Sequence, residues 1–133
     1  FGLAVMYLLQ SALSRGANAR GARWLPSLEA TDRMMHQAMA VALPFLTLLL
    51  ITGAIWGKQV WGRYWGWDPK ETASFVTWLI YLLYFHVRTQ LGWVGWRSAV
   101  IAIVGFASVM FTLFGVNMLS QYAQTLHSYA RSQ

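Results

Sequence analysis

Long apolar runs without a charged side chain constrain this sequence more than any other feature. Residues 39–56 and 98–118 contain no charged side chain, and residues 73–87 contain only a histidine, His86, as a candidate cation. Runs of about 18 or more such residues are typical of helices that cross a lipid bilayer. Charged residues make up 11% of the chain, whereas a soluble domain has about 25%. We therefore expect an integral membrane protein and exclude a water-soluble enzyme.

The net charge of +6 comes from basic residues that lie between the apolar runs. Four arginines fall within residues 14–33, and Arg88 and Arg97 flank a second short segment. Such clusters are typical of cytoplasmic loops in membrane proteins, whereas nucleic-acid binding requires a continuous basic surface. We expect a lipid bilayer around the chain and no nucleic acid partner. The chain has no cysteine, which excludes disulfides and thiolate ligands.

This pattern predicts an all-α fold, a polytopic transmembrane helix bundle forming one membrane domain of about four spans. The spans are expected at residues 1–13, 34–56, 69–88 and 98–119. With the arginine-rich stretch in the cytoplasm, residues 57–68 become an external loop and residues 120–133 an external tail. The chain starts inside an apolar run without an initiator Met, so we expect a partial first span and a C-terminal fragment of a longer protein.

Local signals refine these helices. Candidate N-caps for the second span are Ser27, Thr31 and Asp32. Pro44 lies inside that span and removes one backbone donor, which membrane helices tolerate with a kink. The fourth span carries small residues with a 3-4-3 spacing, which predicts close packing against another helix: Gly105, Ser108, Thr112 and Gly115.

The segment between the second and third spans is unusually rich in aromatic residues. Four tryptophans and Tyr64 fall within residues 56–67, interleaved with glycines. One interpretation is a belt of interfacial aromatic anchors. The other is a platform for a broad, flat, apolar ligand with polar edges, such as a porphyrin, because glycines allow close approach and indole rings supply rigid contact area. The residues alone leave both interpretations open.

Charged residues surround this segment. Asp68, Pro69 and Glu71 match the N-cap, first and third positions of a helix, which predicts that Asp68 caps the third span. Lys58, Arg63 and Lys70 are either interfacial charges or candidate partners of heme propionates.

The run Trp61-Gly-Arg-Tyr-Trp-Gly-Trp-Asp-Pro-Lys-Glu-Thr72 resembles the tryptophan-rich WWD motif of the heme-handling cytochrome c assembly family. Its Asp-Pro-Lys-Glu-Thr ending is similar to the CcsA/ResC branch, the membrane half of the system II cytochrome c synthase. Further similar segments surround it: 25–29, 51–56, 78–86, 115–117 and 126–129. The resemblance implies heme b as cofactor and a heme platform made by Trp61, Tyr64, Trp65, Trp67 and Asp68.

The three histidines are the candidate heme ligands. His86 lies near the inner end of the third span and His127 lies beyond the fourth, at levels separated by a hydrocarbon core of about 30 Å. One iron cannot bind both, so there are either two heme positions or one ligand and one bystander. The resemblance implies that His86 receives heme inside the membrane and that His127 holds it beside the tryptophan loop. His36 is a further candidate ligand, although a polar residue at a helix start explains it as well.

The function that the resemblance implies is cytochrome c biogenesis, namely heme passage across the membrane and its covalent attachment to apocytochrome c. The chain would then belong to a cytochrome c synthase (heme lyase), although no residue stands out as a general base. The implied partners are a CcsB/ResB-type protein or fused domain and an apocytochrome c with a Cys-x-x-Cys-His segment. The implied place is a bacterial inner membrane or a thylakoid membrane, with the loop on the periplasmic or lumenal side. The alternative is a heme export or delivery protein that forms no bond.

Overall fold

The computed structural model describes residues 1–15 and 25–118, and all regular structure in this part of the chain is helical. The elements are α1 (Gly2–Arg15), α2 (Leu28–Trp61), α3 (Pro69–Gln90), α4 (Trp96–Met110) and the π-helical turn η2 (Phe111–Gly115). Residues 116–118 return to the α conformation, so α4 and η2 form one continuous helix up to Met118. The predicted all-α class is confirmed.

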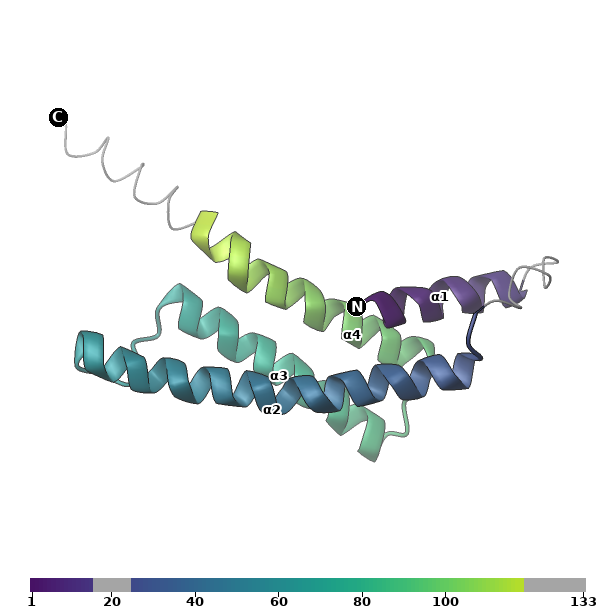
Figure 1. Ribbon diagram of the computed structural model, residues 1–133, viewed down its shortest axis with the longest axis horizontal. Helices are drawn as coiled ribbons and strands as arrows, with labels where there is room; N and C mark the ends of the chain where they lie inside the picture. Colours follow the sequence, from purple (N-terminus) through teal and green to yellow (C-terminus); the bar gives the residue numbers. More distant parts are fainter. Residues whose placement is uncertain (16–24, 119–133) are drawn as a thin grey trace.

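The helices form an up-and-down bundle (Figure 1). α2 lies between α1 and α3, and α4 packs against α3 and α1. The buried core lies nearer the end of the bundle where α2 begins. It consists of alanine, methionine and tyrosine residues from all four helices: Ala4, Met35, Met39, Tyr81, Tyr84, Ala99 and Ala102.

α2 is longer than its apolar run predicts. It begins at Leu28, and the Ser27 hydroxyl caps it by accepting from the Ala30 N–H at 3.2 Å, so Ser27 is the cap among the three candidates. The helix continues through Pro44 and ends at Trp61, five residues beyond the predicted span. Its 34 residues correspond to about 51 Å, which exceeds a hydrocarbon core of about 30 Å. The first part of the predicted loop is therefore helical.

α3 begins where the sequence predicts. Pro69 occupies its first turn, and the Asp68 carboxylate accepts from the Glu71 N–H at 2.7 Å, so the predicted cap is confirmed. The Glu71 carboxylate does not return to the cap residue as in a standard capping box. It accepts instead from the Gly66 N–H at 2.6 Å and so ties the tryptophan-rich loop to the helix.

The small residues of α4 contact α3 over part of the predicted stripe. A Cβ added at Gly105 would lie 3.0 Å from the Tyr81 ring, and the Thr112 hydroxyl lies 3.2 Å from that of Thr77. Gly115 differs, because the atoms nearest to an added Cβ belong to the Phe111 ring of the same helix. Gly115 lies in the π-helical turn, whose wider winding changes the rotation of its residues about the helix axis.

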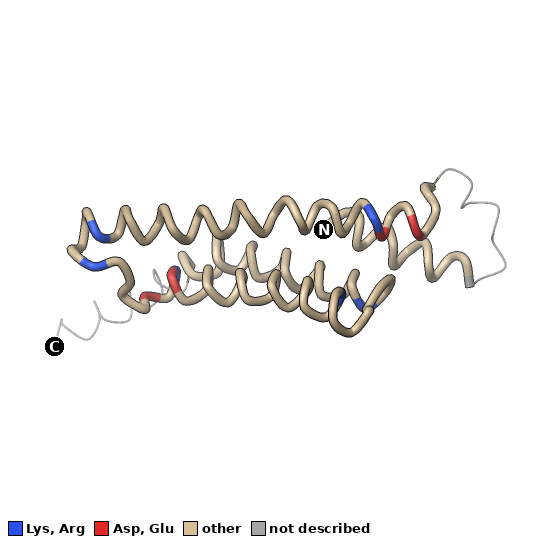
Figure 2. Tube along the Cα trace, turned by 90° about the horizontal axis from the view of Figure 1, so that it is seen from below, with Lys and Arg blue, Asp and Glu red and all other residues tan. Residues whose placement is uncertain are grey.

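Charged residues lie at the two ends of the bundle and leave its middle without a charged side chain (Figure 2). Within the described ranges, α2 and the continuous helix Trp96–Met118 are long and apolar enough to cross a membrane. α1 is a shorter apolar helix, and α3 carries charged residues in its first and last turns.

Candidate tryptophan-lined site

The last turns of α2 carry the first pair of tryptophans. Trp56 and Trp61 meet edge to face, with their ring centroids 5.1 Å apart and their planes at 86°. Both rings are more than half exposed. Gly62 then ends the helix with φ +74°, a left-handed conformation that glycine adopts without strain.

The second pair of tryptophans lies on the loop that leads into α3. Trp65 and Trp67 also meet edge to face, at 5.7 Å and 86°, and Trp65 contacts Phe75 of α3 at 6.1 Å. Trp67 has φ +56°, the one non-glycine residue with positive φ in the described part of the chain. A bulky residue in this region is strained, and such strain persists where surrounding contacts hold the chain.

Three charged side chains hold the loop in this conformation. Glu71 accepts from the Gly66 N–H, and the Arg63 guanidinium lies so close to Gly66 that a Cβ there would be 2.7 Å from it. The Lys58 ammonium donates to the Gly62 carbonyl at 2.9 Å and lies 5.5 Å from the centre of the Tyr64 ring.

Between α2, the loop and the start of α3 is an open hollow. Its walls are the rings of Trp56, Trp61 and Trp65 and an apolar stretch of α2, and its rim carries Asp68, Lys70 and Glu71. The α2 wall is formed by Leu49, Leu50, Gly53 and Ala54, and Ser74 of α3 also lines the hollow. A second apolar hollow between α2, α3 and α4 shares Leu49, Leu50 and Ser74 with it, so the two adjoin along α2.

Only some of the residues predicted as a heme platform line this hollow. Trp61, Trp65 and Asp68 line it, whereas Trp67 lines hollows on the α4 side, together with Phe75 or with residues of α4 such as Ser108. Trp65 borders both sides. Tyr64 is exposed and contacts Lys58 instead.

The three basic side chains that are candidate partners of heme propionates also differ in their surroundings. Lys58 and Arg63 lie against the loop backbone, at Gly62 and Gly66. Lys70 is exposed on the rim of the hollow and makes no ion pair with a described residue. The neighbouring carboxylates of Asp68 and Glu71 already accept backbone N–H groups. Lys70 is therefore the cation best placed for an acidic ligand group in the hollow.

Sequence reasoning missed the α2 wall. Trp56 is the first residue of the aromatic segment. Gly53 and Ala54 fall within a predicted span and within the family-like segment 51–56, but the sequence does not identify any of the three as part of a site. The signal was present, because Leu49, Gly53 and Trp56 follow a spacing of four and three residues and so share one helix face. Which way that face points depends on packing.

The histidines lie apart from this hollow. His86 is exposed in the last turns of α3, at the opposite end of that helix. The half-buried ring of His36 on α2 contacts Tyr84 at 6.1 Å and Phe85 at 5.5 Å, and it makes no ring contact with His86. His127 lies outside the described residues. The proposed roles of all three histidines stay predictions.

The fold and the hollow place this chain among the helical membrane proteins that carry an aromatic-lined site at one end of the bundle. The family model described as cytochrome C assembly protein matches residues 1–124, and the chain belongs to that family. This confirms the family predicted from the tryptophan-rich segment.

Curated relatives named cytochrome c biogenesis protein CcsA support the same assignment. The chain is 46% identical to the relative from Gloeobacter violaceus over 101 residues, 76% of this chain and 29% of the relative. It is 36% identical to that from Chlamydomonas reinhardtii over 127 residues, 96% of this chain and 34% of the relative. The relative from Mesostigma viride is 43% identical over 98 residues, 74% of this chain and 31% of the relative. The chain therefore spans about a third of the length of these relatives, and no solved structure matches it.

Proposed function

We propose that this chain is the heme-handling segment of a cytochrome c biogenesis protein. In this proposal the hollow binds heme b as substrate and promotes its covalent attachment to apocytochrome c. The hollow itself carries the proposal, because three indole rings, an apolar helix face and a free rim cation suit a flat apolar ring with acidic edges. The names of the relatives support the process.

The exposed Lys70 ammonium on the rim supports an acidic ligand at this place. It makes no ion pair with a described residue, so it would balance the charge of a propionate or another acidic group of the bound substrate.

The proposal places the hollow and residues 120–133 on the periplasmic or lumenal side of a bacterial inner membrane or thylakoid membrane. His127 is the proposed axial ligand there, with a second histidine from outside this chain. His86, at the far end of α3, is the proposed ligand of heme on its way through the membrane. Neutral imidazole is a common axial ligand of heme iron.

Attachment requires an apocytochrome c with a Cys-x-x-Cys-His segment and a CcsB/ResB-type partner. Each cysteine thiol adds across one vinyl group: a C–S bond forms at one vinyl carbon and the hydrogen goes to the other. This step consumes no oxidant or reductant. The contribution of the chain is to hold ring and thiols at reacting distance, and positioning alone can lower such a barrier by about 7–11 kcal/mol.

The hollow is tested by filling it. Nothing lies within 4 Å of a Cβ added at Gly53, so Gly53→Phe should enter the hollow without breaking α2. In the full protein co-expressed with its partner and an apocytochrome, we expect covalent heme that survives denaturation to fall at least about tenfold, the equivalent of about 1.4 kcal/mol. The matched control is Leu48→Phe on the exposed face of α2, which should mature cytochrome normally.

Normal maturation by Gly53→Phe would contradict the site. Heme that remains bound in the wild-type protein but is always extractable by denaturant would instead indicate a heme carrier without bond-forming activity.

The ligand is tested separately at His127. We expect His127→Ala to abolish maturation and added imidazole to restore part of it, because free imidazole can occupy the axial position. Covalent heme on the apocytochrome and the absorption spectrum of the purified protein are the two measurements. Maturation at the wild-type level without imidazole would show that His127 is not the ligand.

A further inference from the structure

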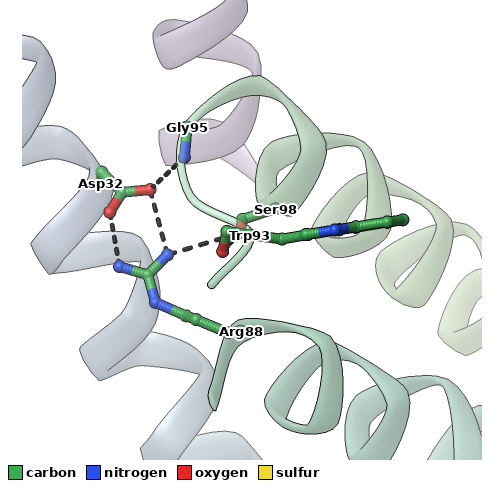
Figure 3. Close-up of polar contacts among 5 residues, drawn as sticks. All are labelled: Asp32, Arg88, Trp93, Gly95 and Ser98. Carbon is green, nitrogen blue, oxygen red and sulfur yellow. Dashed lines mark hydrogen bonds and ion pairs between the residues drawn. The ribbon is translucent and has the colours of Figure 1, made fainter. Parts of the chain in front are cut away.

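A polar cluster joins three helices at the end of the bundle opposite the hollow (Figure 3). The Arg88 guanidinium of α3 forms a two-pronged ion pair with the Asp32 carboxylate of α2, and each side chain is 13% exposed. The same carboxylate accepts from the N–H of Gly95, the N-cap of α4, at 3.1 Å. One carboxylate therefore contacts α3 and the start of α4 simultaneously, and its charge suits the positive end of α4.

The cluster extends into the turn between α3 and α4. Arg88 lies 3.4 Å from the hydroxyl of Ser98, and this hydroxyl donates to the Trp93 carbonyl at 2.8 Å. Ser98 is fully buried. The hydroxyl of Ser98 thus links the backbone of the turn to the same guanidinium that binds Asp32.

A second layer of contacts lies one helical turn inside the first. His36 follows Asp32 by four residues on α2, and Tyr84 precedes Arg88 by four residues on α3. The rings of His36 and Tyr84 stack at 6.1 Å, and Phe85 also contacts His36. His86, on the same turn of α3, points out of this contact and is exposed.

We propose that Asp32 and Arg88 are positioning residues for His86, which fix the level and rotation of the last turn of α3 against α2 and α4. The proposal rests on the proposed function for the role of His86 as a heme ligand. A partly buried ion pair contributes little net stability, and its best-attested use is to specify one register of packed helices. Ring contacts such as that between Tyr84 and His36 are less directional, whereas the two-pronged contact between Arg88 and Asp32 has a fixed geometry that fits one register.

The register of α3 against α2 can be tested by a measurement that does not depend on heme. The chain contains no cysteine, so His36→Cys with Phe85→Cys creates the one thiol pair of this segment. In the full protein, we expect Arg88→Gln to lower the rate of oxidative cross-linking at least about fivefold, the equivalent of about 1 kcal/mol, and Arg88→Lys to lower it less. The matched control is Arg97→Gln, because Arg97 lies at the same end and contacts Trp93 and Trp96 but has no acidic partner among the described residues. Unchanged cross-linking in Arg88→Gln overturns the proposal.

The consequence for His86 is tested by spectroscopy on the full protein purified with its partner. Heme that is lost on His86→Ala defines the His86-dependent fraction. We expect Asp32→Asn and Arg88→Gln to lower this fraction at least about threefold or to shift its reduction potential, while the heme that Gly53→Phe removes is retained. These variants could instead lose the His86-dependent heme and the remaining heme equally, together with loss of protein. That result would show a merely structural role and overturn the proposal. If His86→Ala removes no heme but Arg88→Gln still slows cross-linking, the register is supported and the ligand role of His86 fails.

Discussion

Gly95 shows how much of this fold depends on a single small residue. Its N–H donates to Asp32, its backbone has φ +72° and ψ −131°, and an added Cβ would lie 2.6 Å from the hydroxyl of Tyr7 on α1. The backbone conformation is one that glycine adopts readily and other residues do not. Conformation and space therefore both require glycine where α1, α2 and α4 meet.

Gly95→Ala should consequently lower the stability of the protein by about 2 kcal/mol or more, from backbone strain and from displacement of Tyr7. Gly92→Ala is the matched control, because Gly92 also has a positive φ, +62°, but nothing lies within 4 Å of an added Cβ. We expect that change to lower stability by about 1 kcal/mol, from strain alone. Apparent melting temperatures of the purified protein in detergent provide the comparison. Equal melting temperatures for the two variants would contradict the close contact with Tyr7.

At the scale of elements, the start of α3 could be predicted from sequence and the end of α2 could not. Asp68, Pro69 and Glu71 are a local signal, and local backbone chemistry is sufficient to begin a helix there. Lys58 and Gln59 interrupt the apolar run, which favoured a loop, but backbone hydrogen bonds continue the helix regardless of hydropathy until Gly62.

The hollow was only half predictable for a related reason. The aromatic rings are visible in the sequence, but the wall formed by Gly53 and Ala54 depends on the rotation of α2 about its axis. That rotation is set by packing against α1 and α3 and leaves no trace in a local motif. The family resemblance identifies the tryptophan-rich loop as a candidate heme site but gives no information about its geometry.

The contact between Glu71 and Gly66 makes the loop dependent on the first turn of α3. A hydrogen bond to a charged acceptor contributes about 1.5–3 kcal/mol, so its loss should free a loop that contains the strained Trp67. We expect Glu71→Ala to accelerate amide hydrogen exchange of residues 62–68, measured by mass spectrometry on the full protein. Glu71→Gln retains an acceptor and should accelerate exchange less. Exchange rates equal to those of the wild type in Glu71→Ala would mean that other contacts hold the loop.

At the scale of the whole molecule, two charged ends are separated by a middle without a charged side chain, and α3 connects them (Figure 2). Its 22 residues, Pro69–Gln90, span about 33 Å, with the cap at Asp68 at one end and the ion pair at Arg88 near the other. In between, the helix is held independently by Trp78, whose indole donates to Thr47, and by the pairing of Thr77 with Thr112. These central contacts should isolate each end from changes at the other.

A double-mutant cycle with Gly53→Phe and Arg88→Gln tests this independence. The two positions share no partner and lie at opposite ends of the bundle, so their effects on stability should add to within about 0.5 kcal/mol. The cycle is measured from the midpoints of unfolding of the wild type, both single variants and the double variant under one set of conditions. A coupling above about 1 kcal/mol would mean that α3 transmits displacement along its length. If the central contacts at Thr77 and Trp78 do isolate the two ends, Thr112→Val, which removes the pairing with Thr77, should raise the coupling toward that value.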